Sequence, residues 1–123
     1  MEIFKEFTFD AAHYLPNVPE THKCRRLHGH TYRLRLWMKD GLDPHLGWVM
    51  DFGDIKVAWR SIEPLLDHRT LNEVEGLENP TAEHIAVWIW GRLKPQLPLL
   101  HKVELWESPT AGVVYEGRGG RGR

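Results

Sequence analysis

Two histidines separated by a single glycine stand at the start of an alternating stretch of this chain. His28 and His30 precede a run in which apolar residues recur at every second position as far as Met38. Residues two apart on a β-strand point to the same face, so both imidazoles are predicted at one end of a buried strand face. A lone buried histidine is usually a hydrogen-bonded core residue, but two on one face indicate a pair of metal ligands.

A third histidine, His13, ends an earlier alternating segment, residues 3–13. If this segment pairs with residues 28–39 as an antiparallel strand, its end lies beside their start, and His13 faces the other two imidazoles. Three nitrogen ligands with an open fourth position are typical of catalytic zinc, whereas structural zinc more often takes four ligands with several thiolates. Because the chain has one cysteine, we expect a catalytic Zn²⁺ site. The alternative is a polar core cluster.

The single cysteine, Cys24, lies in the predicted loop four residues before His28. A free cysteine is usually a small buried hydrophobe. This one has Arg25 and Arg26 beside it, and a nearby dication would favour the thiolate. Two functional roles remain open, a fourth metal ligand and a base next to the open metal position, and we favour the base.

Two further sites in the sequence could carry chemistry. His68 follows Asp67 after a predicted helix; it is either a solvated histidine at the helix end or a proton-transfer group whose tautomer a carboxylate sets. Glu107 follows Val103 and Leu105 on a strand face predicted to point inward, where an unpaired carboxylate is costly. It either ends the strand exposed or accepts two parallel N–H groups.

The elements that must position these residues follow from the apolar periodicity. Residues 3–13, 28–39, 101–108 and 111–116 are predicted strands. Asp51 is predicted to cap a helix over residues 52–66, in which apolar residues recur at three- and four-residue steps. Thr81 is predicted to cap a second helix, which Pro95 and Pro98 end. The order is strand, strand, helix, helix, strand, strand.

This order predicts the α+β class, with a four-stranded antiparallel sheet and two helices on one face. The uncovered face would carry Phe4, Glu6, Thr8, Arg33, Arg35, Trp37, Glu104 and Trp106. That mixture is too apolar for water and too charged for a dry core, so we expect it to line an interface or a wet lumen between subunits. The sequence therefore predicts a homo-oligomer.

The composition narrows the class of protein. The 123 residues are 41% hydrophobic and 27% charged, with a net charge of -1. Such a balance does not favour nucleic acid or an anionic membrane as a partner, and no apolar run approaches the roughly 20 residues that span a bilayer. We expect one cytoplasmic domain over residues 1–117, followed by a disordered Arg/Gly tail, residues 118–123.

Five motifs occur in one order: Phe9-Asp10-Ala11-Ala12-His13, Cys24-x-x-x-His28-Gly29-His30, Leu66-Asp67-His68, Asn79-Pro80-Thr81-Ala82-Glu83 and Glu107-x-x-Thr110-Ala111-Gly112. Together they resemble the 6-pyruvoyltetrahydropterin synthase family, over nearly the whole chain from Phe4 to about Gly117. The three residues between the cysteine and His-Gly-His resemble the family's bacterial 6-carboxy-5,6,7,8-tetrahydropterin synthase branch, because the pyruvoyl branch usually has a longer gap.

The resemblance implies a tunnelling fold, in which four-stranded sheets join edge to edge into a barrel around a threefold axis. Trimers then stack, commonly as hexamers, with active sites between subunits. It also implies these roles: Zn²⁺ on His13, His28 and His30; Cys24 as proton acceptor; His68 with Asp67 as proton relay; Glu107 as anchor of the pterin ring; Thr81 as a further ring contact. The basic residues Lys23, Arg25 and Arg26 are candidate contacts for a triphosphate.

The implied reaction starts from 7,8-dihydroneopterin triphosphate. It gives 6-carboxy-5,6,7,8-tetrahydropterin with loss of triphosphate and acetaldehyde, an early step towards queuosine and related 7-deazapurines. Two alternatives remain: the pyruvoyl branch, which eliminates triphosphate without breaking a carbon–carbon bond, and a non-catalytic zinc- or pterin-binding protein.

Overall fold

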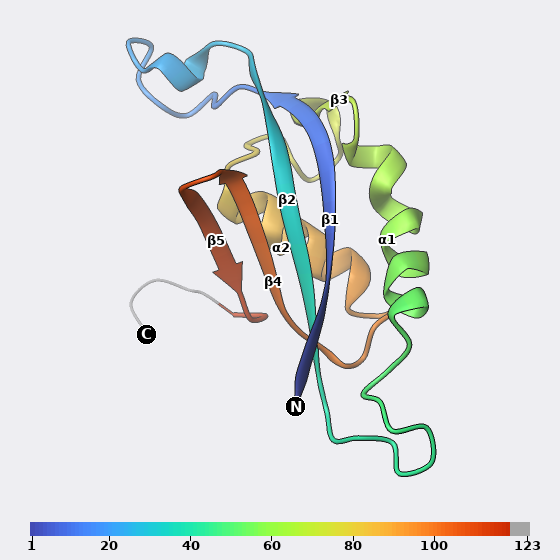
Figure 1. Cartoon of the computed structure of the whole chain (residues 1–123). Helices are drawn as coiled ribbons and strands as arrows, with labels where there is room; N and C mark the ends of the chain where they lie inside the picture. The colour runs from blue at the N-terminus through green and yellow to red at the C-terminus, as the bar shows by residue number, and fades with distance from the viewer. Residues whose placement is uncertain (119–123) are drawn as a thin grey trace.

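The structure, a computed structural model, describes residues 1–118 and consists of one sheet with two α-helices on one of its faces (Figure 1). The elements are β1 (Glu2–His13), η1 (Lys23–Arg25), β2 (His28–Lys39), α1 (Phe52–Leu66), β3 (Arg69–Thr70), η2 (Leu71–Glu73), α2 (Ala82–Leu93), β4 (Leu100–Ser108) and β5 (Ala111–Tyr115). The strand order in the sheet is β3-β1-β2-β4-β5. The predicted α+β class is confirmed.

The prediction of a four-stranded sheet is wrong, because the sheet has five strands. The additional strand, β3, is two residues long and pairs in parallel with Ala11 and Ala12 of β1. Two residues show no alternation, so the apolar pattern gave no signal for it. The turn before β3 contains His68, which has φ 59° and donates its amide N–H to the Asp10 carbonyl at 2.6 Å. The extra strand therefore fixes His68 against the end of β1.

The long antiparallel pair β1–β2 places the three histidines together. Its register runs from Glu2 opposite Lys39 to His13 opposite His28, with Ala11 opposite His30. As predicted, the C-terminal end of β1 lies beside the N-terminal end of β2. The loop that joins them carries η1 and projects beyond the strand ends (Figure 1).

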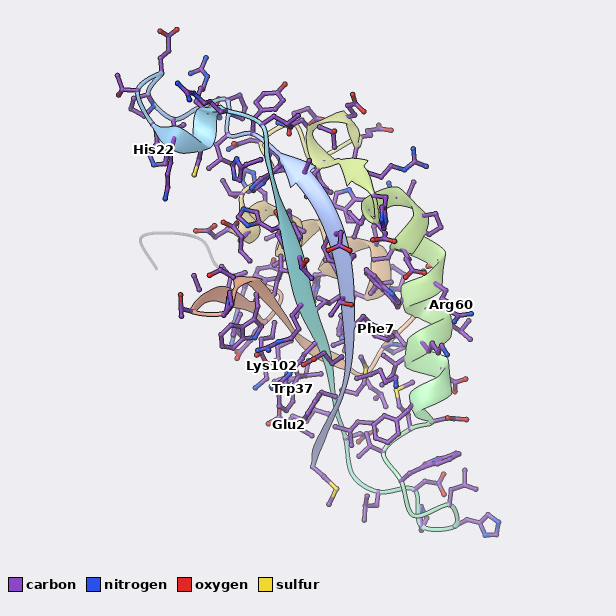
Figure 2. All side chains as sticks on the ribbon, turned by 45° about the horizontal axis from the view of Figure 1, so that its top comes forward. Glu2, Phe7, His22, Trp37, Arg60 and Lys102 are labelled. Carbon is purple, nitrogen blue, oxygen red and sulfur yellow. The ribbon has the colours of Figure 1, made fainter. Side chains whose placement is uncertain are left out.

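The core lies between the sheet and the two helices. Helix α1 packs mainly on β1, and α2 packs on β4 and β5. Figure 2 shows Phe7 on the α1 side of the sheet, whereas Trp37 and Lys102 lie on the other side. The fully buried side chains that fill the core include Phe9, Tyr32, Leu34, Leu36, Ile55, Ile85, Val103 and Leu105. They alternate along the strands and recur along the helix stripes, as the sequence predicted.

Both helices begin at the predicted caps. Asp51 Oδ1 accepts the Gly53 amide N–H at 2.8 Å, and Thr81 Oγ1 accepts the His84 amide N–H at 3.1 Å. These side chains satisfy amide groups that the first turn of a helix leaves unpaired. Pro64 lies inside α1, which continues for two more residues to Leu66.

The uncovered face of the sheet carries charged and aromatic side chains that pair with one another. Arg35 Nε donates to Glu6 Oε1 at 2.8 Å, and Trp37 Nε1 donates to Glu104 Oε1 at 2.9 Å. The Lys102 ammonium lies 4.5 Å from the centre of the Trp37 ring. The charged groups on this face are therefore paired with opposite charges or with aromatic rings.

The described chain ends shortly after β5. Arg118 lies outside any helix or strand, and the rest of the predicted disordered tail, residues 119–123, falls outside the described residues. Among residues 1–118, no helix has the length and apolar character that a membrane crossing requires.

Candidate active site

Three histidines meet where β1 ends and β2 begins. His13, His28 and His30 each offer a ring nitrogen, and these three atoms all lie within 4.8 Å of one another. His13 is buried, and the other two side chains are half-buried. The alternation of both strands brings the rings to the same face, and the antiparallel register brings the strand ends together. The chain thus positions three histidines to bind a metal ion.

The hydrogen bonds of the His13 and His28 rings leave Nε2 of each free for a ligand. His13 Nδ1 donates to the Pro80 carbonyl at 2.8 Å, and His28 Nδ1 donates to the Arg26 carbonyl at 2.7 Å. A carbonyl oxygen only accepts, so the proton of each neutral ring sits on Nδ1 and the lone pair on Nε2. Ligating histidines in metal sites are held in this way.

Two of the free nitrogens are buried without a partner. His13 Nε2 and His30 Nε2 have no hydrogen bond to any described residue, and an unpaired buried polar atom is costly. Burial lowers the pKa of both His13 and His30 below the usual histidine value. Neutral imidazoles can offer a nitrogen lone pair to a divalent metal ion, so the two unpaired atoms fit a metal site.

Glu107 approaches the same three histidines from β4, the strand that pairs with β2 on the edge away from β1. Its Oε1 lies 3.5 Å from His30 Nε2 without a hydrogen bond between the two atoms, and its side chain is 30% exposed. Glu107 stands at a bulge of the β4–β5 pair, where Trp106 pairs with Gly112 and Ser108 with Ala111. Glu107 has the same parity as the buried residues Val103 and Leu105, so its side chain points to the face that carries the histidines. At the end of the strand it is close to them and still accessible.

Two cavities border His30. One, of about 470 Å³, is lined in part by Arg33, Trp106 and Glu107. The other, of about 520 Å³, is lined in part by Asp10 and His68. Both also contact Gly29, His30 and Thr31. These volumes lie in the range of small-molecule sites. Glu107 lines one cavity and His68 lines the other, and His30 borders both.

Asp67 and His68 are in contact. The sequence left open whether His68 is a solvated histidine or a proton-transfer group. His68 Nδ1 lies 3.0 Å from Asp67 Oδ2, while Asp67 Oδ1 accepts the Asp10 amide N–H at 2.9 Å. That amide bond, with a smaller contribution from His68, lowers the pKa of Asp67. The hydrogen bond and charge of Asp67 raise the pKa of His68. The imidazole is oriented by its neighbour and remains 78% exposed.

Cys24 lies in η1, half-buried, and lines neither of these cavities. It does not belong to the group of donor atoms within 4.8 Å that the three histidines form. Its neighbours Lys23 and Arg25 are exposed, and Arg25 Nη1 donates to the Val18 carbonyl at 2.9 Å. Within one chain, Cys24, Lys23 and Arg25 therefore lie on the projecting loop and line neither cavity beside His30.

Thr81 stands at the first turn of α2, directly after Pro80, whose carbonyl holds His13. Sequence reasoning missed this carbonyl, that of Arg26, and the hydroxyl of Tyr32, which lies 3.3 Å from His13 Nδ1. Burial raises the pKa of Tyr32 far above its usual value, so its hydroxyl stays neutral. Backbone carbonyls carry no side-chain signature, so no sequence pattern could have identified them.

The fold and the site together define an α+β protein with three histidines positioned to bind a metal ion at the paired ends of β1 and β2. The sequence profile of the family described as 6-pyruvoyl tetrahydropterin synthase matches residues 2–118. The chain belongs to this family.

Individual relatives span nearly the whole chain. A 6-carboxy-5,6,7,8-tetrahydropterin synthase of Synechocystis sp. is 44% identical, over 92% of this chain and 91% of the relative. A dihydroneopterin monophosphate aldolase of Pyrococcus furiosus is 37% identical, over 89% of this chain and 91% of the relative. The solved structure of Caenorhabditis elegans 6-pyruvoyl tetrahydropterin synthase superposes with a TM-score of 0.89 at 26% identity, covering 96% of each chain.

Proposed function

We propose that this chain is a 6-carboxytetrahydropterin synthase, a carbon–carbon lyase. With one molecule of water, it converts 7,8-dihydroneopterin triphosphate to 6-carboxy-5,6,7,8-tetrahydropterin, acetaldehyde and triphosphate. The observation that carries this proposal is the 44% identity, over 92% of the chain, to a relative named for that product. The three-histidine site supports it, because an inert binding protein has no need of an open metal position.

The metal in this proposal is Zn²⁺, held by His13, His28 and His30. Nitrogen donors suit zinc, and three protein ligands leave a position for substrate. When bound, the ion would polarise a substrate oxygen and lower the pKa of a hydroxyl held beside it.

The side chains around the histidines supply binding and proton transfer. Glu107 accepts two parallel N–H groups of the pterin ring, since it remains 30% exposed beside a cavity of about 470 Å³. Thr81 and the first turn of α2 contact the same ring. Cys24 accepts a proton from the carbon next to a side-chain hydroxyl, and His68, oriented by Asp67, moves a proton on the other side.

Assembly completes the site in this proposal. Cys24 lines neither cavity, and the His68 side chain is 78% exposed, so a second subunit can bring the missing partner to each. The chain offers two strand edges for such contacts: β5 pairs only with β4, and β1 pairs with β3 only at Ala11 and Ala12. Edges that differ favour a closed ring. We propose a trimer-based barrel, stacked as a hexamer.

The remaining parts of the proposal concern context. Residues 1–117 form the catalytic domain, which acts in the cytoplasm on a route towards queuosine and related 7-deazapurines. Lys23 and Arg25, both exposed, contact the triphosphate. The positive charge and free donors of these side chains suit phosphate oxygens.

Product analysis tests the reaction. Zinc-loaded protein is incubated with 7,8-dihydroneopterin triphosphate, the pterin product is identified by mass spectrometry, and acetaldehyde is measured by trapping. We expect a 6-carboxy product and an equimolar amount of acetaldehyde. A 6-pyruvoyl product without acetaldehyde would assign the chain to the pyruvoyl activity instead, and no turnover would indicate a binding protein. A parallel incubation with 7,8-dihydroneopterin monophosphate tests the activity for which the Pyrococcus relative is named.

A further inference from the structure

Two hydrogen bonds of its backbone groups hold Cys24 in the loop. No residue of η1 is fully buried, and Cys24 is half-buried, so these bonds add to a partial packing of the residue. The Cys24 carbonyl accepts the Leu15 amide N–H at 2.8 Å, which ties it to the start of the loop. Its amide N–H donates to the ring of His22, at 3.0 Å from Nδ1. His22 is labelled in Figure 2, on the projecting loop beside the short helix.

His22 itself is held on both sides. Its amide N–H donates to the Pro19 carbonyl at 2.8 Å, and its carbonyl accepts the Arg25 amide N–H at 3.1 Å. The imidazole is the N-cap of η1, a position at which a side-chain acceptor satisfies an amide group that the turn leaves unpaired.

The tautomer of His22 differs from that of the metal-site histidines. His13 and His28 donate from Nδ1 to carbonyls, whereas His22 accepts at Nδ1 from an amide. A neutral ring that accepts at Nδ1 carries its proton on Nε2. His22 therefore uses Nδ1 to accept the hydrogen bond from the Cys24 amide.

We propose that His22 is a positioning residue for the Cys24 thiol, acting through the hydrogen bond from the Cys24 amide to the imidazole. This inference rests on the proposed function, in which Cys24 is the proton acceptor. When the cap is lost, η1 frays and the thiol occupies its productive position for a smaller fraction of the time. The turnover number falls by that fraction, while metal binding and the pterin pocket are unchanged.

Two substitutions at one position separate capping from other roles. His22→Ala removes the acceptor. His22→Asn keeps one, because asparagine Oδ1 and histidine Nδ1 are both two bonds from Cβ, and asparagine is among the best N-cap residues. We expect His22→Ala to lower kcat about tenfold, the rate equivalent of a lost cap, with KM changed by less than about twofold. His22→Asn should restore kcat to near the wild-type value.

A measurement that does not depend on turnover accompanies the kinetics. The rate of Cys24 alkylation by iodoacetamide at one fixed pH should rise in His22→Ala, because a frayed turn exposes the thiol, and return in His22→Asn. Zinc content should be equal in all three proteins. Wild-type kcat and alkylation rate in His22→Ala would overturn the proposal. Equal loss in both variants would also overturn it, since the ring would then be needed for something other than capping.

Cys24→Ala in the same assay distinguishes failure of the positioning role of His22 from failure of the proposed function. If Cys24 is the proton acceptor, its removal should cost at least about a hundredfold in kcat. Normal turnover in Cys24→Ala would refute the proposed role of the thiol. Loss of turnover in Cys24→Ala together with unchanged His22→Ala would refute only the positioning role.

Discussion

His13 and His28 are each oriented by a backbone carbonyl. The partner of His13, Pro80, lies in the distant segment before α2, whereas Arg26 directly precedes β2, two positions before His28. Orientation of the imidazoles is thereby fixed before any ion arrives, which reduces the ordering cost of binding.

Replacing His13 by alanine should remove the metal and loosen the fold. The substitution deletes one donor nitrogen and leaves the Pro80 carbonyl without its donor, which should cost about 1–3 kcal/mol of stability. We expect metal content, measured by plasma mass spectrometry, to drop from about one ion per chain to near zero, with a lower melting temperature. His45→Ala, in an exposed loop, is the control and should change neither. Full metal retention in His13→Ala would contradict the three-histidine site.

The Asp67–His68 pair makes a prediction about protonation. Because the carboxylate of Asp67 raises the pKa of His68, Asp67→Asn should lower that pKa towards the usual value of about 6.5. The asparagine keeps an oxygen that can accept the Asp10 amide N–H, while the group that faces His68 loses both its charge and its acceptor oxygen. The imidazole resonances of His68 in a pH titration by NMR would show the midpoint moving down. The midpoint staying in place would mean that Asp67 does not set the charge of His68.

At the scale of elements, the hairpin β4–β5 carries Glu107 next to the register shift between Trp106 and Ser108. Gly112 faces Trp106 in this hairpin, and a Cβ atom there would lie 2.6 Å from the Leu105 carbonyl oxygen. Because that neighbour is backbone, the strands themselves would have to separate.

Gly112→Ala should therefore destabilise the protein, by about 1–3 kcal/mol, and reduce binding of a pterin through the displaced Glu107. Gly41→Ala is the matched control, since a Cβ there meets nothing within 4 Å, and it should lie within about 0.5 kcal/mol of wild type. Chemical denaturation gives the free energy of unfolding for each. Equal stability of the two variants would show that the hairpin tolerates the extra methyl group.

Much of this architecture could be predicted from the sequence. The alternation of β1 and β2 and the stripes of α1 and α2 are strong periodic signals, because each element buries one face. The predicted strand over residues 28–39 agrees with the observed bounds. Strand β3 could not be predicted, since its two residues join the sheet by position alone.

The site shows the same division. The grouping of His13, His28 and His30 follows from strand parity and antiparallel pairing, both of which the sequence encodes. The 3.5 Å distance between Glu107 and His30 also follows from alternation, because Glu107 shares the parity of Val103 and Leu105 on β4. The orientation of His68, by contrast, depends on a left-handed turn and on β3. Such irregularities arise from tertiary packing and leave no periodic trace.

At the scale of the whole molecule, the sheet leaves two edges and one face open. The open face carries paired charges beside aromatic rings, such as Arg35 with Glu6 and Lys102 over Trp37. A closed ring of sheets would pair the edges and enclose this face. Light scattering coupled to size-exclusion chromatography should therefore give the mass of a multiple of three chains. A monomer mass at the concentration of the activity assay would contradict the shared site.

The bond from His13 to the Pro80 carbonyl spans 67 positions of the chain. A change in the position of that imidazole therefore reaches the segment just before α2, which begins at Ala82. Deuterium uptake by the peptide over residues 79–85 should rise when a chelator is added and fall again when the ion is returned. Backbone amides remote from the donor nitrogens would thus serve as a gauge of occupancy, readable without any substrate at all.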